Sequence, residues 1–121
     1  MPRLLTVDEI QGHRQKYIEH IPRDLPSEEK GRVHRAIEKS LDALQADDGD
    51  TAYSAVEELL DVMRQHPDAG KGEPAPGHNL WAQYWLGCGN DCGGGGVATG
   101  SVWGPAVYAT CYWSCVAANA L

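Results

Sequence analysis

Residues 80–121 read LWAQYWLGCGNDCGGGGVATGSVWGPAVYATCYWSCVAANAL and contain all four cysteines and all four tryptophans of the 121-residue chain. Only one side chain in this stretch, Asp91, is charged. Residues 1–79 hold every Lys and Arg and 16 of the 17 acidic residues, but no Cys or Trp. Because a single folding domain normally mixes these residue types, the division predicts two chemically different parts in one chain.

The first part begins with the pattern of a capped helix. Thr6 and Glu9 match the reciprocal capping box of a helix start, and the apolar residues that follow recur roughly on one helical face. Pro22 and Pro26 stop that helix, since proline cannot continue the ladder of backbone hydrogen bonds. A first helix is therefore expected from Thr6 to about Ile21.

Two further helices follow from their apolar stripes. The second is expected from about Glu28 to Gln45 with Ser27 as its cap, and the third starts at a cap on Asp50 and ends near residues 66–67. The stripes are Val33, Ile37, Leu41 and Leu44 in the second helix, and Ala52, Val56, Leu59, Leu60 and Met63 in the third. These patterns predict a mainly α fold, with a small three-helix bundle over residues 1–66.

Residues 67–79 contain three Pro and three Gly among polar residues, a composition typical of a flexible linker that holds the next segment away from the bundle. Residues 80–121 then form a third region, rich in Cys, Gly and Trp, for which we expect little regular structure. Its first residues, 80–86, could make two helical turns, and residues 102–103 could pair with 106–108 as a short hairpin.

Composition excludes several classes of function. The net charge of −7 leaves no basic patch for nucleic acid, and the chain has neither a secretory signal nor an apolar run long enough to span a membrane. The five histidines pair with no acid in a catalytic pattern, so we expect neither an enzyme nor a cofactor. The intact chain is expected in the cytoplasm where it is made.

The cysteines form two CxxxC pairs, Cys88 with Cys92 and Cys111 with Cys115. On a helix this spacing places both sulfurs on one face, and two opposed faces would allow the nested bridges 88–115 and 92–111. Four cysteines permit three connectivities, among which the sequence does not choose. The same four thiolates could instead bind one zinc ion, which gives an alternative function: a helical protein-interaction module with a zinc-binding tail.

Four hydroxyl side chains accompany the cysteines: Thr99, Ser101, Thr110 and Ser114. Dehydration of Ser or Thr leaves an electrophilic alkene to which a Cys thiolate adds, so equal numbers of the two suit thioether crosslinking. Because Ser and Thr are also ordinary turn residues, chance accounts for the match equally well.

With these features the chain resembles the precursors of ribosomally made, post-translationally modified peptides, in which an acidic helical leader precedes a short core. Residues 92–98, CGGGGVA, are similar to the glycine-rich loops of mersacidin-like lantibiotics and of sublancin-like glycosylated bacteriocins. The resemblance implies that Cys88, Cys92, Cys111 and Cys115 are crosslinked, and that Thr99, Ser101, Thr110 or Ser114 is modified.

The resemblance also implies partners for each part of the chain. Maturation enzymes would hold the leader, with the face formed by Val56, Leu59, Leu60 and Met63, or an exposed patch beside it, as the recognition site. A leader protease or transporter would cut in a processing region marked by Ala69, Gly70, Gly72 and Gly77. The released core of residues 80–121 would be secreted as an antimicrobial-type peptide that acts on a membrane or cell-envelope target.

Overall fold

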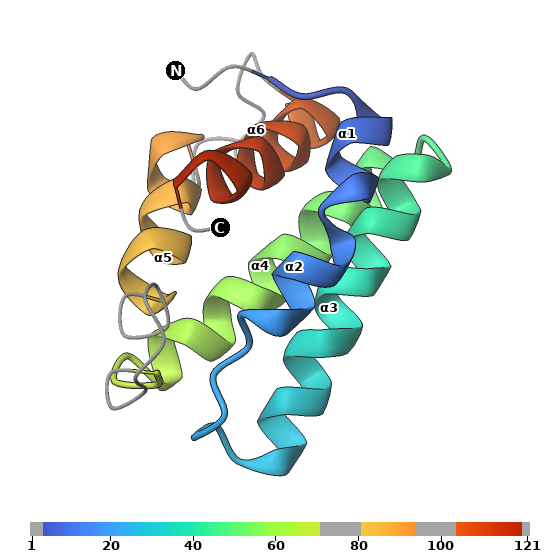
Figure 1. Ribbon diagram of the computed structural model, residues 1–121. Helices are drawn as coiled ribbons and strands as arrows, with labels where there is room; N and C mark the ends of the chain where they lie inside the picture. The colour runs from blue at the N-terminus through green and yellow to red at the C-terminus, as the bar shows by residue number, and fades with distance from the viewer. Residues whose placement is uncertain (1–3, 71–80, 94–103, 120–121) are drawn as a thin grey trace.

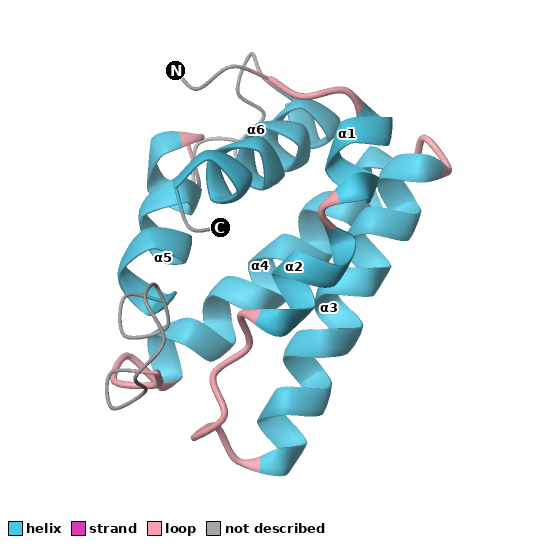
Figure 2. Ribbon diagram, in the orientation of Figure 1, coloured by secondary structure: helices cyan, strands magenta, loops and turns pink. Residues whose placement is uncertain are grey.

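The computed structural model describes residues 4–70, 81–93 and 104–119, apart from the side chain of Ala82. This part of the chain contains helices and no strands, as Figure 2 shows. The helices are α1 (Val7–Gly12), α2 (Arg14–Glu19), α3 (Ser27–Gln45), α4 (Gly49–Gln65), α5 (Trp81–Asp91) and α6 (Gly104–Asn119). The predicted mainly α fold is confirmed. In Figure 1, α3 and α4 form the long pair, α1 and α2 lie in front of it, and α5 and α6 lie on the α4 side of the pair.

The helix start at Thr6 is confirmed. The Thr6 hydroxyl accepts a hydrogen bond from the Glu9 backbone N–H at 3.1 Å, and the Glu9 carboxylate accepts one from the Thr6 N–H at 3.0 Å. The prediction of one continuous helix to Ile21 is wrong, because the backbone leaves helical geometry at His13 and separates α1 from α2. Gly12 directly precedes the break, and glycine is a poor helix former.

Both long helices occur where the apolar stripes predict them, but their predicted caps are wrong. Ser27 is already the first helical residue of α3, and Pro26 occupies the capping position. Asp48, two residues before the predicted Asp50, caps α4 by accepting a hydrogen bond from the Thr51 N–H at 3.2 Å. Asp48 directly precedes the first helical residue, Gly49, and its backbone is not helical, as is typical of a residue that caps a helix start.

The C-terminal region is more regular than its composition predicts, since residues 81–91 and 104–119 are helical. The hairpin expectation is wrong for residues 106–108, which lie in α6; residues 102–103 lie outside the described part. At the start of α6, Gly104 has a backbone φ of +72°, which glycine adopts readily. Pro105 follows it, and proline is well tolerated in the first turn of a helix. Within α6, the hydroxyls of Thr110 and Ser114 donate to the carbonyl oxygens four residues earlier, so these polar groups are satisfied without leaving the helix.

The C-terminal helices share a hydrophobic core with the rest of the chain, so the prediction of a tail held away from the bundle is wrong. Figure 1 places α6 against α4 and α1. Eight residues of α6 are buried: Tyr108, Ala109, Cys111, Tyr112, Trp113, Ser114, Cys115 and Val116. A helix that is apolar on every face is stable in water only when other elements cover it, and α1 and α4 supply this cover.

Candidate functional site

Two nested disulfides join α5 to α6. Cys88 is bonded to Cys115 and Cys92 to Cys111, with Cα–Cα distances of 5.6 and 5.8 Å. Cys92 directly follows α5, and its N–H donates to the Cys88 carbonyl oxygen at 3.0 Å, which continues the helical turn. Because each pair is spaced by four residues, both sulfurs of each pair lie on one face, and the two faces oppose each other. Of the three connectivities that the sequence leaves open, the structure has the nested one. We call α5 and α6, with these two bonds, the cross-linked hairpin.

The disulfides leave no free cysteine. A thioether to Ser or Thr needs a thiol, and zinc binding needs thiolates, so neither chemistry is available to the cysteines in this state. In addition, no group of three or more His, Cys, Asp or Glu side chains within the described ranges is arranged to hold a metal ion. The zinc-binding alternative therefore disagrees with the structure.

Trp113 of α6 anchors the hairpin in the bundle through both its ring and its backbone. The indole Nε1 donates a hydrogen bond of 2.8 Å to the Ser40 hydroxyl of α3, which itself donates to the carbonyl oxygen of Ala52 in α4 at 2.9 Å. The Tyr17 hydroxyl of α2 donates to the carbonyl oxygen of Trp113 at 3.0 Å. All three bonds are buried, so one tryptophan is held by side chains from two helices of the bundle.

Aromatic rings surround this anchor. The ring of Trp113 lies 4.7 Å from that of Tyr17, 5.1 Å from that of Tyr112 and 6.1 Å from that of Trp85, centroid to centroid. The contacts to Tyr112 and Trp85 are edge-on, a preferred arrangement for aromatic pairs. Rings from α2, α5 and α6 thus meet in one cluster.

Sequence reasoning missed Tyr17 and Ser40 as binding residues for the C-terminal region. Ser40 is completely buried although it is polar. It lies three residues after Ile37 and four before Leu44, on the apolar stripe of α3. A polar residue at such a position needs a buried partner, and this signal could have identified it.

Two glycines permit close approach between the hairpin and α4. A Cβ added to Gly49 would lie 2.7 Å from the Cβ of Ala106 and 2.9 Å from its backbone nitrogen. A Cβ added to Gly89 would lie 2.8 Å from a methyl carbon of Leu60. Both positions therefore depend on the absence of a side chain.

The predicted modification sites differ in accessibility. Ser114 is buried, and its hydroxyl accepts a hydrogen bond from the Leu5 N–H at 2.9 Å. Thr110 is partly exposed, while its hydroxyl donates to the Ala106 carbonyl oxygen. Thr99 and Ser101 lie outside the described residues. In this fold, Thr110 is thus better placed for an enzyme than Ser114.

The predicted recognition face is covered in the folded chain. The side chains of Val56, Leu59, Leu60 and Met63 are all buried in the common core. An enzyme that binds the folded chain would have to use the exposed surface beside them.

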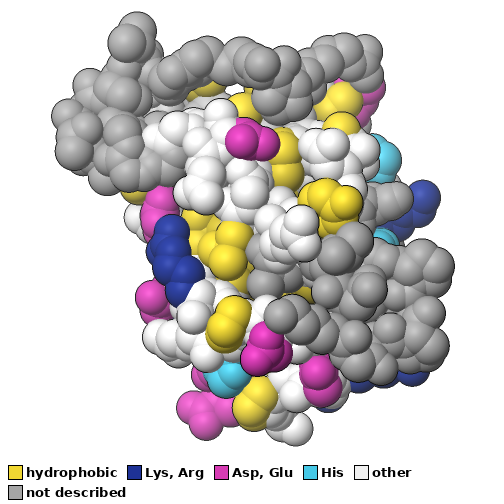
Figure 3. Space-filling model, turned by 90° about the vertical axis from the view of Figure 1, so that its left-hand side faces the viewer, with side chains coloured by type: hydrophobic (Ala, Val, Ile, Leu, Met, Phe, Trp, Pro, Cys, Tyr) yellow, Lys and Arg dark blue, Asp and Glu magenta, His cyan; other side chains and the backbone are white. Residues whose placement is uncertain are grey.

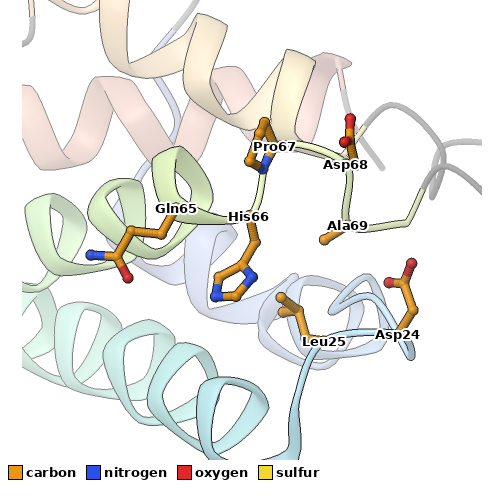
Figure 4. Close-up of a pocket in the computed structure, with 7 residues that line it drawn as sticks. All are labelled: Asp24, Leu25, Gln65, His66, Pro67, Asp68 and Ala69. Atoms are coloured by element: carbon orange, nitrogen blue, oxygen red, sulfur yellow. The ribbon is translucent and has the colours of Figure 1, made fainter.

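The start of the predicted processing region is tied to the bundle. The Gly70 backbone N–H donates a hydrogen bond of 2.8 Å to the Asp24 carboxylate, and Ala69 is buried. A pocket of about 320 Å³ lies at this junction, between residues 24–25 and residues 65–69 (Figure 4). Its polar lining includes Asp24, His66 and Asp68. Gly72 and Gly77 lie outside the described part of the chain.

Burial raises the pKa of the Tyr17, Tyr108 and Tyr112 hydroxyls well above the usual value. Desolvation is the main cause for all three, and nearby Glu57 adds to the shift at Tyr108 and Tyr112. Within the described residues, the hydroxyls of Tyr108 and Tyr112 and the Nε1 of Trp81 are buried and have no hydrogen-bond partner. These three atoms all belong to the C-terminal helices, whereas Tyr17 has a partner in Trp113.

The outer surface of the hairpin carries little charge. Tyr84 and Val107 are exposed apolar side chains of α5 and α6. Figure 3, which looks at the side of the molecule that carries α5, shows scattered hydrophobic side chains among uncharged surface, with charged side chains in several places on the same face. Among the helices that the structure describes, none combines the length and apolar character needed to span a membrane.

Comparisons with protein-family models, curated proteins and solved structures found no match for this chain. Its function therefore has to be argued from the residues and their geometry.

Proposed function

We propose that the chain is the precursor of a secreted, antimicrobial-type peptide, in which residues 1–70 carry and cover the cross-linked hairpin until a protease cuts between residues 70 and 81. Maturation enzymes and a leader protease or transporter are the partners in this proposal. The precursor is made in the cytoplasm, and the product acts outside the cell.

One observation carries the proposal: both disulfides lie inside residues 81–119, and the chain has no further cysteine. The main chain is thus the only covalent connection between the hairpin and residues 4–70. One cut in the intervening segment would remove the only covalent link between an acidic carrier and a product that keeps its own crosslinks. Each bond would stabilise the released product by about 3 kcal/mol in the chain-entropy model.

The chemistry of the product supports the same function. Residues 81–119 contain Asp91 as their one charged side chain and are rich in Trp and Tyr. Aromatic side chains with a polar edge favour the interface between membrane and water. Much of this apolar surface is buried, and rings of the carrier contact it: Tyr17 packs on Trp85 and Trp113, and Tyr53 on Tyr108. The carrier would thereby keep the product inactive in the producing cell.

Intact-mass measurement on the native product tests the proposal. We expect a peptide that begins between residues 71 and 81 and is lighter than the unmodified sequence by four hydrogens for its two disulfides. The added mass of a hexose would identify glycosylation as the modification that the resemblance implies for Thr99, Ser101, Thr110 or Ser114. Recovery of only the uncut 121-residue chain from cells and medium would contradict the proposal.

The activity itself can be tested on vesicles. The cut and purified hairpin is expected to release dye from vesicles, whereas the intact chain at equal concentration should not. A hairpin reduced and alkylated at its four cysteines is the matched control, and we expect it to lose most of the activity. Equal leakage by the intact chain would mean that residues 1–70 do not cover the active surface.

A further inference from the structure

We infer that residues 4–70 form a specific noncovalent receptor for the cross-linked hairpin, so that the two pieces remain bound after the main chain has been cut. The inference rests on the proposed function and adds a step to it: cleavage alone does not release the product. The receptor's partner is thus the hairpin itself, supplied as a separate molecule.

The extent of burial is the first argument. Trp81, Trp85, Tyr108, Tyr112 and Trp113 are each at most 1% exposed. The two helices of the hairpin can cover only part of each other, and α6 also contacts α1, α3 and α4. Separating the pieces would expose a large aromatic surface to water, and this opposes dissociation whether or not the main chain is intact.

Directional bonds make the contact specific. Ser40 and Tyr17 hold the side chain and the backbone of Trp113, and the Leu5 N–H donates to the Ser114 hydroxyl. These bonds come from three separate segments of the receptor, before α1, in α2 and in α3, and they converge on two neighbouring residues of α6. A helical peptide of similar composition without a tryptophan at this place would leave the Ser40 hydroxyl without its indole partner.

Shape adds a further restriction. The absence of a side chain at Gly49 lets the start of α4 approach the backbone of Ala106 at the start of α6. Any larger residue at position 49 would collide with backbone atoms, which move less readily than a side-chain end. The affinity of the receptor should therefore depend on this glycine, but not on Gly12, whose added Cβ would meet nothing within 4 Å.

The experiment starts from the full chain, with a specific protease sequence replacing residues 72–77. After cleavage of the folded, oxidised protein, native mass spectrometry and gel filtration at low micromolar concentration should give a 1:1 complex of the two pieces. Elution of two separate pieces, with both disulfides still intact by mass, would overturn the inference.

Variants of the same cleavable chain then test the contacts. Ser40→Ala is expected to weaken the complex about tenfold, because the buried indole N–H loses its acceptor. Gly49→Ala should weaken it at least about tenfold by overpacking, whereas Gly12→Ala, the matched control, should leave the affinity within about twofold. Circular dichroism of each uncut variant confirms that it folds. Equal affinity of all variants would contradict the inference that residues 4–70 bind the hairpin through these specific contacts.

The outcomes separate this inference from the proposed function. A cut complex that holds together while no cleaved product is found in native material would support the receptor and count against the precursor. Pieces that separate at once, alongside a cleaved native peptide with two disulfides, would support the precursor and overturn the receptor.

Discussion

The α3–α4 pair and the cross-linked hairpin reach stability in opposite ways. In α3 and α4 each helix buries one apolar stripe and exposes charged side chains, some of them paired, as Arg32 is with Glu58 at 3.4 Å. The hairpin has almost no charge, buries α6 over most of its surface and is closed by two covalent bonds. The α3–α4 pair thus exposes a charged surface suited to water, whereas the hairpin depends on its two disulfides and on burial by the other helices.

Among the changes considered, removing the crosslinks should lower the stability of the hairpin most. Reduction of both disulfides is expected to lower the free energy of unfolding by about 2–5 kcal/mol for each bond, because the unfolded C-terminal region regains its freedom. Circular dichroism during thermal unfolding, with and without reductant, measures the change. We expect the helicity of α5 and α6 to be lost first and that of α3 and α4 to persist.

The control for that experiment is a chain with all four cysteines changed to Ser, on which the reductant should have no effect. An unchanged melting temperature of the native chain in reductant would show that the cover from α1 and α4 suffices without the crosslinks.

Removing the anchor should have the next largest effect. Trp113→Ala deletes a completely buried side chain, and we expect a loss of about 3–5 kcal/mol in a denaturant titration. Tyr84→Ala removes an aromatic side chain from the outer face, where it is 39% exposed, so the loss should stay below about 1 kcal/mol. Similar losses for both variants would mean that the hairpin is not held at Trp113.

High pH should selectively weaken the same contacts. Because burial raises the pKa of Tyr17, Tyr108 and Tyr112 in the folded state, the unfolded chain ionises first, near its usual pKa of about 10. The stability contribution of each phenol is therefore complete below pH 10 and falls above it, by about 1.4 kcal/mol per pH unit. Denaturant titrations between pH 9 and 11 measure how steeply the free energy of unfolding falls with pH. In Tyr112→Phe this slope should be smaller by the contribution of one phenol. A slope that is identical in the variant would contradict the assignment.

The smallest expected change in stability distinguishes a phenol hydroxyl with a hydrogen-bond partner, Tyr17, from one without, Tyr112. Tyr17→Phe removes the hydrogen bond to the Trp113 carbonyl oxygen and is expected to cost about 1 kcal/mol. Tyr112→Phe removes a buried hydroxyl that has no partner, so stability should stay the same or rise by up to about 1 kcal/mol. Equal losses in chemical denaturation at pH 7 would contradict the difference in bonding.

The two regions also differ in how well the sequence predicts them. The buried faces of α3 and α4 can be predicted from spacing alone, because the apolar residues of an amphipathic helix recur at the helical period. In α6 the apolar residues leave no such signal, since they surround the helix, and Val107, Tyr108 and Tyr112 favour strands when taken singly. Its helical form depends on α1 and α4, which are far away in sequence.

The candidate site shows the same limit. The spacing of Cys88, Cys92, Cys111 and Cys115 is sufficient to suggest opposed pairs, but their connectivity depends on how α5 and α6 meet. The bond from Trp113 to Ser40 joins residues 73 positions apart, a separation that no local pattern encodes. The only local indication of this bond is that Ser40, a polar residue, lies on the apolar stripe of α3 and therefore needs a buried hydrogen-bond partner.

The confinement of tryptophan to the C-terminal region gives this molecule a built-in optical probe. Indole emission shifts to longer wavelength when the ring passes from an apolar environment into water, and residues 1–79 contribute no indole at all. Any change in the spectrum therefore reports on the surroundings of the last third of the chain. Dissociation of the pieces could be followed in real time without a label, in a buffer or in a vesicle suspension free of other emitters.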